Sequence, residues 1–363
     1  MTKPYYMFRH SARRAVWCVA AAAVVVCVSC AGGEDRQEKP GHRFTVETLN
    51  GYTPVKHQGT NPVCWAYAML SAIETEHIMR GDSVHLSVKY AVRQVIEESA
   101  VRCYLAGSVR PLRLRATAHT LLDAISARGL VPNDAYGDAD GADFATLGRK
   151  AFRIAAGAAS GRQGLRFVRE RVCRIADEDL GPVPRRVFML GAEYTPQEFA
   201  RSVCAPGEYI AVTSFTHHPY HKFAGLELPD NYNRDRFYNL PLDTMMSVLA
   251  QAVSHGRGVC WEGDISEPGF SFADGTAVLP YRAPSDAAAR QSAFERFDTT
   301  DDHSMAVVGM ARDSSGRRYF IMKNSWGTDN PFGGLMYLSE DYVRMKTIAL
   351  FLPADCVPVR DGR

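Results

Sequence analysis

The chain has 363 residues, 46% of them apolar, and a formal net charge of +2. This length and apolar content suffice for one large domain or two small ones. Four basic residues, Lys3, Arg9, Arg13 and Arg14, precede the first acidic residue, and without them the formal charge falls to −2. The rest of the chain is nearly neutral and has no basic stripe, which argues against nucleic acid as a partner.

The first 29 residues have the pattern of a secretory signal peptide. A basic start precedes an apolar run over residues 15–28, which is shorter than the roughly 20 residues that span a bilayer. Ser29 and Cys30 end the run as in a bacterial lipoprotein signal, in which Cys30 carries the lipid. We predict export from a bacterial cytoplasm and a membrane-anchored lipoprotein facing the periplasm or the cell surface. Cleavage near Ala31 and an uncleaved anchor are the alternatives.

The remaining chain divides by composition into a tether, a folded domain and a tail. Residues 30–43 are polar and rich in glycine and charge, which predicts a flexible tether. We expect the folded domain over residues 44–352 and a short tail over residues 353–363. The sequence of this domain shows no internal repeat.

Helical periodicity dominates the first half of the domain. Apolar residues recur every three to four positions over residues 65–80, between Pro62 and Gly81 as start and stop signals. Two more helices are expected over residues 86–100 and 116–128. Residues 143–205 have the same periodicity and predict an inserted helical subdomain.

The second half is rich in β-branched and apolar runs that predict strands, with one helix over residues 242–255. The strand-like runs cover residues 209–214, 258–262, 305–310, 319–323, 335–338 and 347–352. A turn at residues 313–316 predicts a hairpin that brings His303 and Asn324 to one end of a sheet.

Three distant stretches supply the parts of a thiol acyl-transfer site. Cys64 would be the nucleophile, at the start of a helix whose positive end favours a thiolate. His303 would move protons as the imidazolium partner of that thiolate, and Asn324 would orient its ring. Gln58 would donate to the oxyanion beside the Cys64 N–H. Asp302 could stabilise the imidazolium or be a solvated carboxylate, so it is not part of the predicted catalytic set.

The order Gln58, Cys64-Trp65, His303 and Asn324-Ser325-Trp326-Gly327 resembles that of papain-like cysteine peptidases. This resemblance implies that Trp65 and Trp326 line the substrate site, and that Trp326 shields the His303–Asn324 hydrogen bond from water. A second cysteine often precedes the nucleophile in that superfamily. Asn61 stands at its place here, so that disulfide is not expected.

The segments 216–243, 258–264 and 300–305 resemble the bleomycin hydrolase/aminopeptidase C branch. The resemblance implies a papain-like two-lobed α+β fold, with an N-terminal helical lobe, a C-terminal β-barrel-like lobe and the site between them. Members cleave peptides, often from the N-terminus, and some form hexameric rings, so a homo-oligomer is possible. A C-terminal arm gates the cleft in that family, and residues 353–363 differ from the usual arm.

We therefore predict a cysteine peptidase that hydrolyses peptide bonds through a thioester, as an aminopeptidase and without a cofactor. An endopeptidase of the same family, a non-catalytic peptide-binding lipoprotein and a thiol acyltransferase are the alternatives. A metal site at His217, His218 and His221 is not favoured, because Pro219 intervenes and no carboxylate or cysteine is seen to complete the set.

Overall fold

The computed structural model describes residues 43–107, 110–137, 141–189, 191–280, 283 and 285–359. The predicted signal peptide, Cys30 and nearly all of the predicted tether lie outside these residues. The residues described below belong to one compact unit, residues 42–363. Among the described residues, no helix is both long and apolar enough to cross a membrane.

The three predicted helices of the first half are confirmed. Helix α1 covers Cys64–Met79, α2 covers Val88–Leu105 and α3 covers Ala118–Arg128. Gly129 ends α3 with a φ of 86°, a backbone conformation that glycine adopts readily. Helix α2 runs past its predicted end because Val101 and Cys103 continue its buried face.

Residues 143–205 contain three helices, as their periodicity predicted, and a short hairpin that it did not. The elements are α4 (Phe144–Ser160), α5 (Leu165–Leu180), α6 (Pro196–Val203) and the paired strands β2 (Val187–Met189) and β3 (Ala192–Tyr194), while a single 3-10 turn, η1 (Asn133–Ala135), precedes them. Leu147 and Val168 join the same apolar core as α1 and α2. The status of this segment as an insertion stays a prediction.

The second half forms one large mixed sheet with three helices, and it contains all six predicted strands and the predicted helix. The strands are β4 (Tyr209–Thr213), β5 (Lys222–Gly225), β6 (Arg236–Asn239), β7 (Val259–Gly263), β8 (Phe270–Ser271), β9 (Thr276–Ala277), β10 (His303–Asp313), β11 (Arg318–Lys323), β12 (Leu335–Ser339) and β13 (Thr347–Pro353). The helices are α7 (Leu242–Ser254), α8 (Ala287–Glu295) and α9 (Glu340–Lys346), and the 3-10 turn η2 (Ala354–Cys356) follows β13.

The sheet is open in the part of the chain that the structure describes. Its strand order is β5-β6-β4-β13-β7-β10-β11-β12-β9-β8, and β1 (Phe44–Leu49) pairs with β10. Nothing among the described strands joins β5 to β8. The barrel-like closure expected from the family resemblance is therefore not shown.

Strand β10 is the central strand for the site. It pairs antiparallel with β7 near His303, with β11 from Ala306 onward and with β1 near Asp313. The predicted hairpin turn is present, and Gly316 adopts a φ of 83° within it. Because Ala306 pairs with Lys323, the end of β11 returns Asn324 to the end of the sheet where β10 begins.

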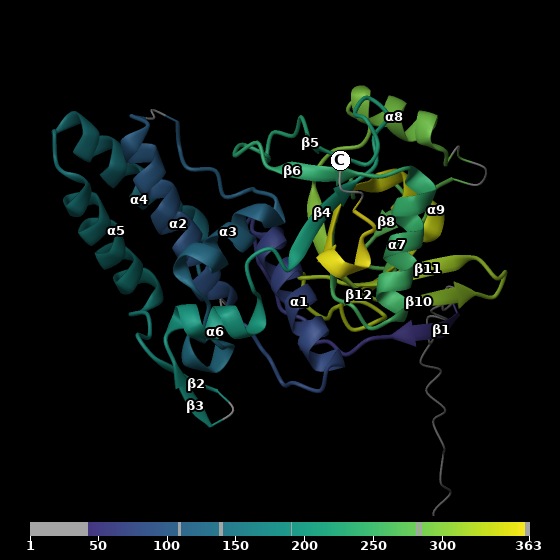
Figure 1. Cartoon of the computed structure of the whole chain (residues 1–363), viewed down its shortest axis with the longest axis horizontal. Coiled ribbons are helices and arrows are strands. Elements are labelled where there is room, and N and C mark those ends of the chain that lie inside the picture. The colour runs from purple at the N-terminus through teal and green to yellow at the C-terminus, as the bar shows by residue number, and fades with distance from the viewer. Residues whose placement is uncertain are drawn as a thin grey trace, which may run out of the picture. The chain divides into compact units, whose positions relative to one another are not determined.

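Helix α1 lies between the helical part and the sheet (Figure 1). In this view α2 to α6 gather on one side of α1 and the strands of the large sheet on the other. Thirteen of its sixteen residues are buried, so the helix has hardly any solvent-facing side. This burial fixes the position of its first residue, Cys64.

Candidate active site

Cys64 is the first residue of α1 and lies half-buried in a pocket of about 210 Å³. Val63 caps the helix without a side-chain hydrogen bond. The backbone N–H groups of the first helical turn have no partner within the helix, and the positive end of the helix dipole lies there. The nucleophile predicted from the sequence thus lies at the positive end of a helix dipole.

His303 begins β10 in the same pocket and contacts Asn324. Its Nε2 donates to Asn324 Oδ1 over 2.7 Å, which leaves Nδ1 as the free ring nitrogen. Asn324 Oδ1 also accepts from the Ser325 N–H at 2.8 Å, so the amide oxygen is held toward the ring. The Trp326 ring lies 4.7 Å from the imidazole, centroid to centroid, and covers one face of the pair.

Gln58 is held in the pocket by the segment that follows Asn324. Its Oε1 accepts from Ser325 Oγ at 2.6 Å, and its Nε2 donates to the Asn61 carbonyl at 2.9 Å. One N–H of the amide is therefore used, and the other stays available. Asn61 also connects this loop to the start of α4, because its side chain donates to Ala142 O and accepts from Phe144 N. These hydrogen bonds, and no disulfide, fix this loop: all six cysteines of the described residues are free.

Burial shifts the pKa of both reactive groups toward their neutral forms. Burial raises the pKa of the Cys64 thiol to about 11, against hydrogen bonds from the Ser304 backbone and hydroxyl that lower it. Burial lowers the pKa of His303 to about 4, against the Asn324 hydrogen bond that raises it. Burial in a low-dielectric pocket disfavours charge on each group. The thiolate–imidazolium pair expected from the sequence stays a prediction.

The two tryptophans predicted to line the substrate site both border this pocket, in different ways. Trp65 is 1% exposed, and its indole Nε1 donates to Leu114 O at 2.8 Å, so it mainly anchors the wall. Trp326 is half-buried and forms a T-shaped contact with Phe272, with ring centroids 5.5 Å apart. Gln58, Cys64 and His303 line the pocket beside these rings.

Sequence reasoning missed an acidic wall of the pocket. Asp230, Asp301 and Asp302 line it together with Arg115. Arg115 pairs with Asp230 at 2.8 Å and donates to the Asp301 backbone carbonyl. The only sequence signal was the position of Asp301 and Asp302 next to His303. Arg115 and Asp230 are far away in the sequence, and only the fold brings them there.

Asp301 has an uncompensated carboxyl oxygen. Its buried Oδ2 has no hydrogen-bond partner among the described residues. Burial and the charge of Asp230 raise the pKa of Asp301 to about 7, against the charge of Arg115. A cationic group placed at this oxygen would favour the ionised form.

The acidic wall also borders a larger cavity of about 700 Å³. Arg115, Asp230, Asp301 and Asp302 are common to both linings. The lining of the cavity also includes apolar Phe294 and Phe297 and the carboxylates Glu227 and Glu295. The acidic wall therefore lies between the small pocket of Cys64 and the larger cavity, which has room for a peptide side chain.

Residues 187–358 match the model of the Peptidase C1-like family. No curated protein sequence matches the chain. The structure of PepW from Lactobacillus rhamnosis HN001 aligns with a TM-score of 0.65 and 15% identity, over 86% of this chain and 83% of PepW. Bromelain from Ananas comosus, solved with the inhibitor E64, aligns with a TM-score of 0.41 and 14% identity, over 83% of this chain and 93% of bromelain.

The likeness to PepW concerns the fold alone, since the identity is low. It identifies a papain-like α+β fold with a helical N-terminal part and a large mixed sheet. The pocket of Cys64 lies where these two parts meet, because α1 belongs to the first and β10 to the second.

Proposed function

The chain belongs to the Peptidase C1-like family of cysteine peptidases through residues 187–358, and from this premise we propose that it is an aminopeptidase acting through Cys64. The observation that carries the proposal is the 2.7 Å hydrogen bond from His303 to Asn324 in the pocket that Cys64 lines. It supports a ring whose Nδ1 is free to take the thiol proton.

In the proposed reaction, the Cys64 thiol passes its proton to His303 as the sulfur attacks the peptide carbonyl. The Cys64 N–H and the unused N–H of Gln58 stabilise the oxyanion. His303 then gives the proton to the leaving amine, and a thioester remains on Cys64. Water, deprotonated by His303, hydrolyses the thioester and regenerates the thiol. Burial favours the neutral form of both groups, and we therefore propose that the proton moves as the attack proceeds.

The acidic wall supports the choice of an aminopeptidase. A peptide's free α-amine is cationic below its pKa of about 8, and a peptide acylated at its N-terminus has no such charge. The unpaired Asp301 Oδ2 offers a charge-assisted hydrogen bond to that amine, next to the pocket of Cys64. We propose that Asp301 recognises the N-terminus, with Arg115 and Asp230 fixing its position.

The test is one peptide series with free and acetylated N-termini, given to the wild type and to Asp301→Asn. We expect stepwise cleavage of free peptides only, and a kcat/KM about 10- to 100-fold lower in the variant, the value of one charge-assisted hydrogen bond. With an Asp301 pKa of about 7 and a substrate amine pKa of about 8, wild-type kcat/KM rises from pH 6 to about pH 7.5 and falls above it as the amine loses its proton. The variant lacks the rising part of this profile.

Other outcomes separate the alternatives. Internal cleavage of both series identifies an endopeptidase. Transfer to an added amine without hydrolysis identifies an acyltransferase, and binding without turnover identifies a peptide-binding protein. Alkylation of Cys64 by iodoacetamide is the control for Asp301→Asn. It should be as fast or faster, because the charge of Asp301 raises the pKa of the thiol.

We also propose that the protein is a membrane-anchored lipoprotein exported from a bacterial cytoplasm. The basic start, the apolar run over residues 15–28 and the Ser29-Cys30 pair support this proposal. We expect the full chain to fractionate with membranes and Cys30→Ser to lose most of that association. Equal membrane retention of the two proteins, measured by immunoblotting after alkaline extraction, would exclude a lipid on Cys30.

A further inference from the structure

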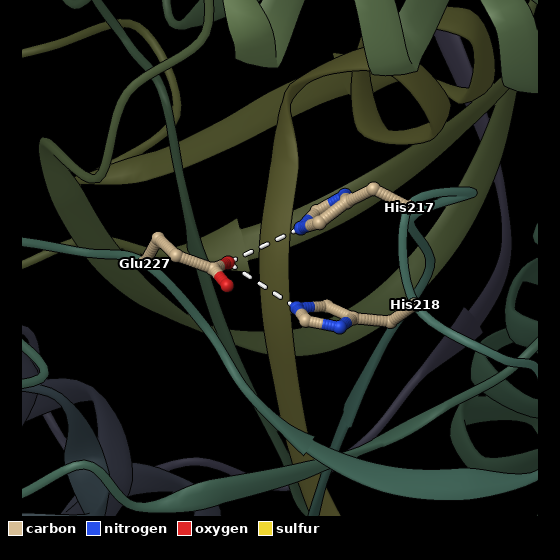
Figure 2. A group of neighbouring side chains, drawn as sticks. All are labelled: His217, His218 and Glu227. Carbon is tan, nitrogen blue, oxygen red and sulfur yellow. Dashed lines mark hydrogen bonds and ion pairs between the residues drawn. The ribbon is translucent and has the colours of Figure 1, made fainter.

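Three side chains converge at the edge of the larger cavity, away from Cys64. His217 and His218 follow β4, and Glu227 follows β5. Figure 2 shows both imidazoles pointing toward the Glu227 carboxylate. The sequence grouped His217 and His218 with His221 and found no carboxylate to complete a metal site. The fold supplies that carboxylate, and we propose that His217, His218 and Glu227 bind a divalent transition-metal ion such as Zn²⁺.

The distances suit a tetrahedral ion. His217 Nε2 lies 3.1 Å and His218 Nε2 lies 3.2 Å from Glu227 Oε2, and the three ligand atoms all lie within 4.8 Å of one another. Zn²⁺ holds nitrogen and oxygen at about 2.0–2.1 Å, so its ligand atoms are about 3.3 Å apart. Each histidine nitrogen is therefore already at about that distance from the Glu227 oxygen.

Neighbouring groups already orient the His217 ring. Its Nδ1 lies 3.2 Å from Gln291 Oε1 and 2.9 Å from Gln291 Nε2, so the amide satisfies either tautomer. The Thr216 N–H holds Gln291 Oε1 at 2.7 Å, and the Phe294 ring stacks on the imidazole with centroids 5.8 Å apart. A ligating histidine commonly donates its other ring N–H to an oxygen, which fixes its orientation. Gln291 provides that oxygen.

The site is also open to solvent. The side chains of His217, His218 and Glu227 are 29%, 20% and 62% exposed, which gives an ion an entry path. His217 and Glu227 line the larger cavity, so a water or a ligand in the cavity can complete the coordination. Two imidazoles favour Zn²⁺ or a similar ion over Mg²⁺ and Ca²⁺, which prefer oxygen ligands.

The simpler account of the cluster needs no ion. One carboxylate oxygen accepts two imidazole N–H groups, and the cluster is then a surface hydrogen-bond network. The two accounts differ in a measurable way. Metal binding requires deprotonated Nε2 lone pairs, so protons compete with the ion and binding weakens in acid.

The experiment measures Zn²⁺ binding to the full chain carrying Cys64→Ser, which removes the catalytic thiol as a competing ligand. Zn²⁺ is titrated against a chromophoric chelator at pH 7.5 and at pH 5.5, and Co²⁺ is used in parallel for its visible absorption. We expect one Zn²⁺ dependent on the cluster at pH 7.5, tetrahedral Co²⁺ bands, and weaker binding at pH 5.5. Adding His218→Ala or Glu227→Gln should weaken binding at least about tenfold.

The matched control is His255→Ala in the same Cys64→Ser chain, since His255 is an exposed histidine outside the cluster. It should bind Zn²⁺ as the parent chain does. Thermal unfolding without Zn²⁺ checks that the variants are folded. Equal Zn²⁺ affinity in His218→Ala and in the control would overturn the proposal, as would the absence of Zn²⁺ binding at pH 7.5.

Discussion

Replacing Cys64 by alanine should lower kcat for peptide hydrolysis at least about 10⁴-fold, since a catalytic nucleophile acts as one unit with its base. His303 keeps its hydrogen bond to Asn324 in this variant, but it has no thiol to deprotonate. The loss should appear in kcat, because the groups proposed to recognise the peptide stay in place. Steady-state kinetics with a free-amine peptide measures it.

Cys356→Ala is the matched control for this variant. Cys356 is also half-buried and free, and it lies on η2 outside the lining of the catalytic pocket. We expect wild-type turnover from it and unchanged circular dichroism from both variants. Turnover of Cys64→Ala within tenfold of the wild type would assign the chemistry to another nucleophile.

Arg290→Met should lower the free energy of unfolding by about 4 kcal/mol, because buried acceptors lose their donors. Arg290 lies on α8 and is 1% exposed. Its guanidinium donates to four backbone carbonyls, and these belong to Ser214, Arg344, Met345 and Thr347. It also lies 4.6 Å from the Phe215 ring. One side chain thus ties α8 to the end of β4, to α9 and to β13.

Methionine keeps most of the volume and removes every donor, so the four carbonyls would stay buried without partners. Arg296→Met is the control, since Arg296 ends the same helix with a side chain that is 64% exposed. Chemical denaturation of both variants measures the difference. Equal unfolding free energies within about 0.5 kcal/mol would mean that water replaces the lost donors.

The sequence was sufficient to predict features that depend on local patterns and on pairing of strands that are adjacent in the chain. Periodicity located α1, and the start signal at Pro62 placed Cys64 at its first turn. The turn at residues 313–316 predicted the pairing of β10 and β11, from which the approach of His303 to Asn324 follows. These features depend on neighbours in the chain and on one hairpin.

What the sequence could not predict depends on contacts between distant segments. Arg115 precedes α3, yet it pairs with Asp230 beyond β5, and no local pattern relates them. Glu227 meets His217 and His218 only because β4, β5 and β6 share one edge of the sheet. The raised pKa of Cys64 and the lowered pKa of His303 follow mainly from burial, which the two residue types alone do not determine.

Strand β10 has neighbours on both sides, and buried α1 packs against the same sheet. Amides in such elements exchange with solvent mainly through global unfolding, whereas terminal or peripheral segments open locally at much lower free energy. Helices α4 and α5 contact α2 and each other, so they can loosen without separating α1 from β10. Thermal inactivation should therefore coincide with the loss of the whole fold. Partial opening of α4 and α5 should leave the Cys64 thiol and the His303 imidazole in their relative positions.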